Sequence, residues 1–221
     1  MARLARVVIP GLPHHVTQRG IGRRKVFYNE ADYSLYRDLL AESCKAAGVA
    51  CWAFALLPSH VHAILVPSDE DGLRAALAPV HRRYAGIVNA RRRRAGHFWQ
   101  GRYGAAVMDE EHLAAAFRYI LRNPVAAGLA RQPEGWRWSS AAAYLKGRAD
   151  GVTETRAMLS RFPDMAALLK GRDRSLGEAV VRDDETIGRP RGNAAFLARL
   201  ERRTGRSLAA AKPGPKPETG R

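Results

Sequence analysis

Apolar positions recur at helical spacing, three and four residues apart, in three parts of the first 130 residues. Each of these segments places its apolar side chains on one face, which predicts an amphipathic helix packed against a core. Between them lie short apolar or alternating runs, bounded by Pro, Gly and acidic turns, that predict strands. The predicted helices are 32–44, 72–90 and 109–123, and the predicted strands are 15–18, 49–57, 60–66 and 101–108.

The order of these elements, strand-helix-strand-strand-helix-strand-helix, is that of a split βαβ, ferredoxin-like sandwich. Only Pro58 and Ser59 separate the second strand from the third, so these two strands are expected to form a central hairpin. The sequence therefore predicts an α+β fold with an antiparallel sheet over about residues 10–130, followed by a C-terminal helical extension.

The regular pattern loosens beyond this domain. We divide the chain into a main domain, a helical extension that packs on it, and a basic C-terminal segment: residues 1–130, 131–187 and 188–221. Helices are expected at 141–147 and 158–169, and Phe196, Leu197 and Leu200 mark one face of another. The segment GRPRG before that helix is either an accessory DNA-binding arm or has no function, and the Lys- and Pro-rich tail is expected to be disordered.

Positive charge dominates the chain. Lys and Arg number 37 against 21 Asp and Glu, a formal net charge of +16, while 46% of the residues are hydrophobic. A folded domain with this balance favours a polyanionic partner, nucleic acid first and an anionic membrane surface second. Acidic residues are absent before Glu30 and again from Gly72 to Met108. Arginine suits phosphate contacts, and the candidate DNA-binding residues are Arg19, Arg23, Arg24, Arg91, Arg92, Arg93, Arg94 and Arg102.

Other sequence features exclude several classes of protein. The chain contains no apolar run of about 18 residues that could span a bilayer, and its first residues lack the apolar core of a secretory signal. Cys44 and Cys51 have neither metal-ligand nor redox spacing. We therefore expect a cytoplasmic protein without a membrane partner. The alternative to DNA binding by Arg91 to Arg94 is that they form a solvated helix end, where cations complement the helix dipole.

Two histidines carry the first candidate chemistry. His60 and His62 are two residues apart on a predicted strand, so their side chains leave the same face. Two imidazoles on one face can share a divalent cation, which assists attack on a phosphate. The alternative is that both histidines are structural and bonded to the backbone.

A tyrosine and an asparagine on the last predicted helix of the domain share one face. Tyr119 and Asn123 are four residues apart, and a helix packed across the sheet would bring them toward the histidines. A tyrosine nucleophile, a metal ion and basic surroundings form a set suited to nicking or transferring a DNA strand. The alternative places Tyr119 at the core edge and makes Asn123 a helix-end residue before Pro124.

Four ordered motifs resemble those of the REP-associated tyrosine transposases, which are single-tyrosine members of the HUH endonuclease superfamily. The motifs are LLPSHVHAILVP, HFWQGRYGAAV, FRYILRNPVAAGL and WRWSSAAAYL, and the likeness runs from about His14 to Leu145. The resemblance implies a ferredoxin-like domain that cuts single-stranded DNA beside hairpins. It also implies that His60 and His62 hold Mg²⁺ or Mn²⁺, that Tyr119 forms a 5′-phosphotyrosine, and that Asn123 stands where relatives place a polar third ligand.

The leading hypothesis is thus a metal-dependent DNA endonuclease and transposase acting on single-stranded or hairpin DNA, with a homodimer possible. The competing hypothesis is a non-catalytic DNA- or RNA-binding protein on the same fold, in which the histidines serve structure only. An RNA-processing protein also fits the charge, whereas no helix pairs a basic face with a broad apolar one, as a membrane-surface protein requires. Trp99 and Tyr103 are candidates for base stacking, although core packing is favoured for both.

Overall fold

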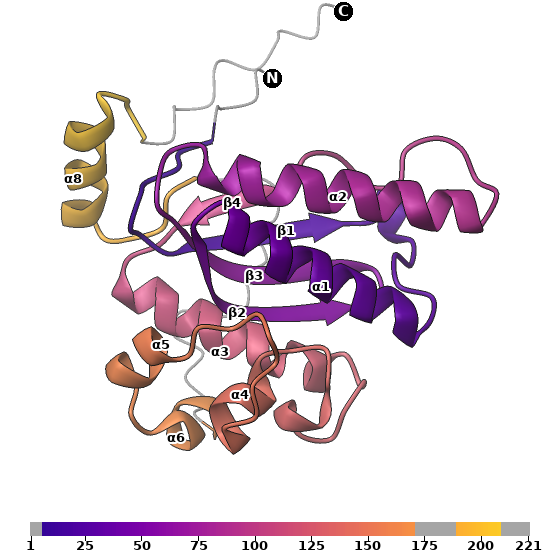
Figure 1. Cartoon of the computed structure of the whole chain (residues 1–221). Helices are drawn as coiled ribbons and strands as arrows, with labels where there is room; N and C mark the ends of the chain where they lie inside the picture. Colours follow the sequence, from indigo (N-terminus) through magenta and orange to yellow (C-terminus); the bar gives the residue numbers. More distant parts are fainter. Residues whose placement is uncertain (1–5, 171–188, 209–221) are drawn as a thin grey trace, which may run out of the picture.

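A four-stranded antiparallel sheet forms the centre of the computed structural model, which describes residues 6–170 and 189–208 (Figure 1). Within this part the strand order is β2-β3-β1-β4. The strands are β1 (His14–Arg19), β2 (Val49–Leu57), β3 (His60–Pro67) and β4 (Gly104–Val107), and the main helices are α1 (Glu30–Ala46), α2 (Gly72–Arg91) and α3 (Glu110–Ala126). Element order and strand order together confirm the predicted ferredoxin-like α+β fold.

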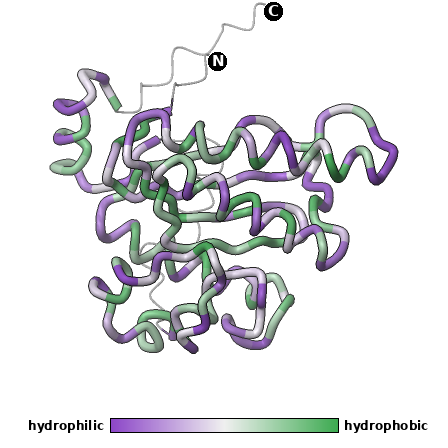
Figure 2. Tube along the Cα trace, viewed as in Figure 1, coloured by the Kyte–Doolittle hydropathy of each residue, from purple (hydrophilic) through white to green (hydrophobic). Residues whose placement is uncertain are grey.

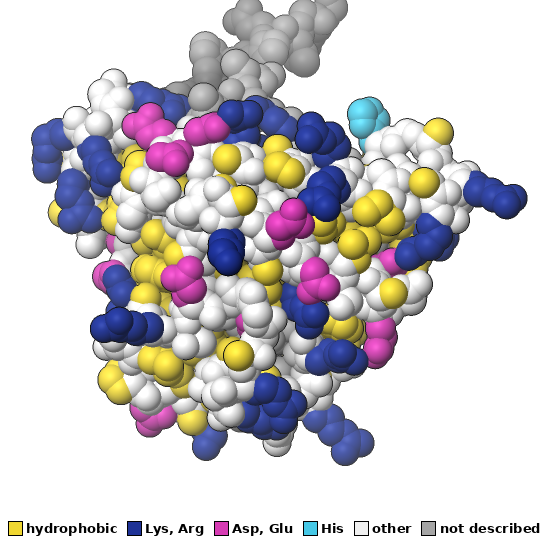
Figure 3. Space-filling view, in the orientation of Figure 1, with side chains coloured by type: hydrophobic (Ala, Val, Ile, Leu, Met, Phe, Trp, Pro, Cys, Tyr) yellow, Lys and Arg dark blue, Asp and Glu magenta, His cyan; other side chains and the backbone are white. Residues whose placement is uncertain are grey.

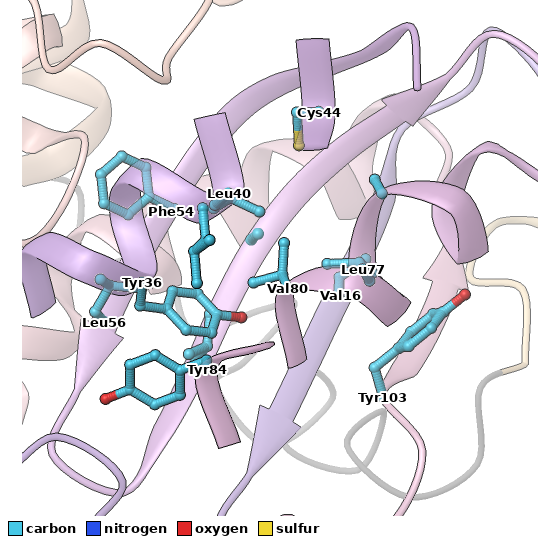
Figure 4. Close-up of a cluster of buried hydrophobic side chains, with 14 of the residues drawn as sticks. Val16, Tyr36, Leu40, Cys44, Phe54, Leu56, Leu77, Val80, Tyr84 and Tyr103 are labelled. Carbon is cyan, nitrogen blue, oxygen red and sulfur yellow. The ribbon is translucent and has the colours of Figure 1, made fainter. Parts of the chain in front are cut away.

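Helices α1 and α2 cover one face of the sheet. Tyr36 and Leu40 of α1 and Tyr84 of α2 are almost completely buried, and they pack with Val16 of β1 and Phe54 of β2 (Figure 4). In Figure 2, β2 and β3 are coloured mainly as hydrophobic, as expected for a sheet covered by helices, whereas β1 is coloured mainly as hydrophilic. This face carries the larger core cluster and forms the rigid support for the opposite face.

Helix α3 covers the other face, together with three short helices of the C-terminal extension. These are α4 (Ala141–Lys146), α5 (Arg156–Arg161) and α6 (Met165–Lys170), and they lie beside α3 below the sheet in Figure 1. Phe117, Ile120 and Leu121 of α3 are fully buried against Ile64 of β3. The apolar stripe of α3 thereby fixes which of its side chains face β3.

The sheet edges of the described residues are both covered by irregular chain. At β2, Leu56 N donates to Trp138 O and Ser140 N donates to Phe54 O. At β4, Arg191 N donates to Val107 O, and the helix that follows, α8 (Ala194–Thr204), buries Phe196 and Leu200. Covered edges remove the unpaired backbone groups through which sheets self-associate.

Three predicted boundaries differ from the structure. The predicted helix 158–169 is broken into α5 and α6 around Pro163, whose ring cannot donate an amide hydrogen bond. Helix α3 continues through Pro124 to Ala126, because near the helix end only one backbone bond is lost. The fourth strand spans four residues rather than the eight of 101–108. The predicted disorder of the tail falls on residues outside the described part of the chain, and so does the whole of 171–187.

No helix in residues 6–170 or 189–208 is long and apolar enough to cross a membrane.

Candidate nucleic-acid cleavage site

The two histidines of the HVH motif begin β3. In the antiparallel pairing of β1 with β3, His60 lies opposite Arg19 and His62 lies opposite Thr17. Because alternate residues of a strand share a face, both imidazoles lie on the same side as Ile64, which packs under α3. The ring centroids of His60 and His62 are 5.0 Å apart, with the planes almost perpendicular.

Helix α3 brings Tyr119 to this pair. The ring of Tyr119 meets that of His62 edge to face, with centroids 5.3 Å apart. Tyr119 is partly buried beside the core under α3, and Asn123 lies one helical turn further on the same side. The Asn123 side chain is buried, and its Nδ2 has no hydrogen-bond partner among the described residues. The four residues predicted from the sequence to form a site thus come from one strand and one helix that pack together.

Burial keeps both histidines neutral. Desolvation is the main cause that lowers the pKa of His60 to about 4, and the nearby Arg19 guanidinium lowers it further. Desolvation likewise holds the pKa of His62 well below 6.5, with added effects from His15, His60 and Arg19. Neutral imidazoles offer lone pairs, so both residues are in the form that a metal ion requires at neutral pH.

His15 belongs to the same cluster, although its sequence pattern did not single it out. Its Nε2 lies 3.1 Å from Nδ1 of His62, and the two rings are nearly parallel. The strand alternation of β1 places it on the α3 face, but its proximity to His62 depends on the pairing register of β1 with β3, which local sequence does not reveal. His14 faces the other way and has a structural role, since its Nε2 accepts from Ile9 N.

Two basic loops meet at the end of the sheet where His60 lies. Ile21 N donates to Phe98 O, and Gln100 N donates to Arg19 O, so the segments 20–25 and 92–100 run side by side. Gly20 N donates to Ser59 O, immediately before His60. A Cβ at Gly20 would lie 2.4 Å from Arg24 O, so only glycine permits this close turn. The backbone thereby fixes the arginine-rich loops beside the histidine pair.

The predicted DNA-binding arginines divide into two groups. Arg91 forms an ion pair of 2.6 Å with the fully buried carboxylate of Asp32, and Arg92 lies over the ring of Tyr28 at 3.7 Å. These two side chains therefore hold the end of α2 against the start of α1. The others lie in the two loops, on β1 or before β4, and all but the partly buried Arg19 are exposed: Arg19, Arg23, Arg24, Arg93, Arg94 and Arg102.

Lysine and arginine side chains are spread over the visible surface in Figure 3, including the end at which α2 terminates. Trp99 and Tyr103 pack in or beside the core under α2. The indole Nε1 of Trp99 donates to His81 O, and Arg6 lies over the ring of Tyr103 at 3.8 Å. The aromatic rings predicted as possible base-stacking platforms are thus engaged within the fold.

The side chains gathered at this site offer nitrogen and oxygen donors for a divalent ion. The described residues contain no group of three or more His, Cys, Asp and Glu side chains that could hold a metal. The two neutral imidazoles supply two nitrogen ligands, and the buried amide of Asn123 can supply an oxygen if its unpartnered end is turned toward them. Such an incomplete set fits a catalytic ion that takes its remaining ligands from water or a substrate phosphate. The residues present therefore fit the ion.

Comparisons with known proteins find a matching family model and similar solved structures. The family model described as "Transposase IS200 like" matches residues 9–123. A solved structure titled as the REP-associated tyrosine transposase bound to a REP hairpin superimposes with a TM-score of 0.55 at 20% identity, covering 70% of this chain and 92% of that one. A putative transposase from Deinococcus radiodurans gives a TM-score of 0.38 at 22% identity, covering 54% and 95% of the two chains. No curated protein matches the chain.

Proposed function

Because this chain belongs to the IS200-like transposase family, and is therefore a DNA transposase, we propose that it cuts and rejoins single-stranded DNA through Tyr119 with the help of a divalent cation. The observation that carries this proposal is the contact between the Tyr119 ring and His62, which brings a phenol to a pair of neutral imidazoles. Neither residue alone indicates cleavage. Together they supply a nucleophile and a cation site within one packed face.

His60 and His62 would hold the ion through imidazole nitrogens, with the Asn123 amide oxygen as a third ligand. A bound Mg²⁺ or Mn²⁺ supplies Lewis-acid polarisation of the scissile phosphate. Nitrogen ligands are better suited to Mn²⁺ than to Mg²⁺, so the proposed site binds Mn²⁺ more tightly. Arg19, which lies opposite His60 on β1, adds positive charge beside the phosphate.

The reaction forms one bond and breaks one. The Tyr119 oxygen loses its proton and attacks phosphorus, the P–O3′ bond breaks, and the departing 3′ oxygen takes up a proton. The strand on the 3′ side of the break keeps the phosphate and is left joined to Tyr119 through its 5′ end as a phosphotyrosine, which keeps the ester energy for joining to another 3′-hydroxyl. The reaction requires no nucleotide cofactor.

The proposed substrate is a single strand next to a DNA hairpin. The structurally similar transposase is described as bound to a REP hairpin, and the sequence motifs of this chain resemble the same group. The loops 20–25 and 92–100, held together by backbone bonds beside His60, offer a basic path for the phosphates of the flanking strand. Arg23, Arg24, Arg93, Arg94 and Arg102 are proposed to contact that path.

The test incubates the full chain with a labelled hairpin oligonucleotide carrying single-stranded flanks, in the presence of Mn²⁺ or Mg²⁺. A covalent protein–DNA adduct is expected on a denaturing gel, together with a product ending in a 3′-hydroxyl. Tyr119→Phe abolishes the adduct, whereas the control Tyr28→Phe, which keeps the ring under Arg92, leaves it intact. An adduct that persists in Tyr119→Phe removes Tyr119 as the nucleophile. Tight hairpin binding without an adduct from any hairpin or ion indicates the non-catalytic binding protein.

A further inference from the structure

A third histidine, His15, lies directly behind His62 of the proposed cation site. His15 of β1 and His62 of β3 form a hydrogen bond between Nε2 and Nδ1, and their rings are inclined by only 12° with centroids 5.3 Å apart. The two residues are 2% and 0% exposed, so water cannot replace the bond. The orientation of the His62 ring therefore depends on the buried side chain of His15 and not on solvent.

This bond determines which His62 nitrogen serves a cation. A neutral imidazole carries a proton on one nitrogen and a lone pair on the other. Because Nδ1 of His62 is engaged with His15, a cation bound by His62 uses Nε2, and Nε2 must then carry the lone pair. With a cation bound, His62 would carry its proton on Nδ1 and donate it to Nε2 of His15, and the remaining ring proton of His15 would lie on Nδ1, a buried atom with no hydrogen-bond partner among the described residues.

His60 shows the same arrangement. Its Nδ1 lies 3.0 Å from the hydroxyl oxygen of Ser59, which can accept a proton donated from that nitrogen. Both histidines of the pair are thus held at Nδ1 by a neighbouring acceptor, although one acceptor is buried and the other is partly exposed. Outer partners of this kind fix the tautomer and ring orientation of metal-binding histidines.

We propose that His15 is a positioning residue, which accepts the Nδ1 proton of His62 and so presents the Nε2 lone pair to the divalent cation. The proposal rests on the proposed function, because it assumes a cation at His60 and His62. His15 itself contacts neither cation nor DNA in this scheme. Ser59 plays the corresponding part for His60, with a weaker effect, since water can reach that site.

Three variants of the full chain separate positioning from packing. His15→Phe keeps a ring of similar size but removes the acceptor. His15→Gln restores an acceptor, because the end of its amide reaches about as far as Nε2 of histidine. Ser59→Ala removes the corresponding hydrogen-bond partner of His60. Binding of Mn²⁺ without DNA is measured from the free-ion signal in electron paramagnetic resonance, and thermal unfolding reports the integrity of each variant.

His15→Phe is expected to weaken Mn²⁺ binding about 10- to 100-fold, which is the usual cost of losing an outer partner. His15→Gln is expected to recover most of that loss, and Ser59→Ala is expected to lose less than His15→Phe. Unchanged Mn²⁺ binding in a folded His15→Phe chain overturns the proposal, as does a His15→Gln chain that binds no better than His15→Phe.

A measurement on the unaltered chain covers the case in which His15→Phe does not fold. In protein labelled with ¹⁵N at histidine and saturated with Mg²⁺, two-bond nitrogen–proton correlations report the tautomer of His62. A proton on Nδ1 is expected, and a proton on Nε2 overturns the proposal. If the unaltered chain binds neither Mn²⁺ nor Mg²⁺, the cation site and the positioning role both fail, whereas metal binding that His15→Phe leaves intact contradicts the positioning role alone.

Discussion

The ring of Tyr119 stands edge-on to the imidazole of His62, with centroids 5.3 Å apart and planes inclined by 88°. This contact joins α3 to β3 within a single chain. The histidines and the phenol therefore come together without a second copy of the protein. The contact also makes the position of Tyr119 depend on the packing of Phe117, Ile120 and Leu121, the buried stripe of the same helix.

Asn123 provides a direct test of the third ligand. Its side chain is buried and one end of its amide has no hydrogen-bond partner among the described residues. We expect Asn123→Leu to weaken Mn²⁺ binding, while Asn123→Asp retains or strengthens it because a carboxylate is the better oxygen ligand. Titration with Mn²⁺ in the absence of DNA measures both. Equal affinity in all three chains shows that Asn123 takes no part in binding the ion.

Arg91 is expected to act mainly on stability. Its guanidinium pairs at 2.6 Å with Asp32, whose carboxylate is fully buried and also accepts from Tyr28 N. Removing the cation leaves that buried charge uncompensated, so Arg91→Ala lowers the free energy of unfolding by about 1–3 kcal/mol. Urea denaturation measures the loss. If Asp32→Asn combined with Arg91→Ala is no more stable than Arg91→Ala alone, the buried charge is not its cause.

Arg94 is expected to act on DNA binding instead. It is exposed in the loop that follows α2, beside the loop 20–25. Arg94→Ala should leave the free energy of unfolding unchanged while weakening hairpin DNA binding. The slope of log K against log salt should become shallower by about 0.7–0.9 for each phosphate that the variant no longer neutralises. Arg83→Ala is the control, since Arg83 pairs with Glu42 on the outer face of α1 and α2. An identical salt slope in Arg94→Ala and the unaltered chain places Arg94 off the DNA path.

The sequence predicted the main elements because their signals are local. The amphipathic spacing of α1 to α3 and the turn at Pro58 and Ser59 each depend on neighbouring residues. The ferredoxin-like fold was predicted from the order of the elements along the chain, and the observed strand order belongs to that fold. The break at Pro163 was missed because the apolar positions on either side share one helical spacing.

The site was only partly accessible from the sequence. His60, His62, Tyr119 and Asn123 could be paired because strand alternation and helical spacing define faces. His15 was missed because its bond to His62 depends on the register between two strands that are far apart in sequence. The roles of Arg91 and Arg92 within the fold were hidden for the same reason, since their partners Asp32 and Tyr28 precede them by about 60 residues. A charge run shows where cations are, but not which of them are already paired.

Helix α8 is expected to keep the β4 edge closed. Arg191 N donates to Val107 O, and the buried side chains of Phe196 and Leu200 hold the following helix against Val7 and Ile9. Leu200→Asp places a charge in this cluster and should release the edge, giving concentration-dependent self-association in sedimentation velocity experiments. Ala195→Asp, on the exposed face of the same helix, is the control. A monodisperse Leu200→Asp chain of unchanged size would show that the edge stays covered without α8.

His81 is expected to make the fold sensitive to acid. It lies on the buried face of α2, beside Tyr36, Trp99 and Tyr103, and its Nε2 hydrogen-bonds to the hydroxyl of Tyr36. Desolvation, followed by the nearby Arg6 charge, lowers the pKa of His81 from 6.5 to about 3. The unfolded chain therefore takes up a proton at this residue between those two pH values while the folded chain does not, so the free energy of unfolding falls as the pH falls below 6.5.

His81→Gln removes this titration and retains a partner for Tyr36. Relative to the unaltered chain, it should lose about 2 kcal/mol less stability between pH 7 and pH 5, because each pKa unit corresponds to about 1.4 kcal/mol. The exposed His97 offers the control variant His97→Gln. Urea denaturation at several pH values measures the slopes. Parallel profiles for His81→Gln and the unaltered chain would assign the acid sensitivity to the other buried histidines, His14, His15 and His62, whose pKa values burial also lowers.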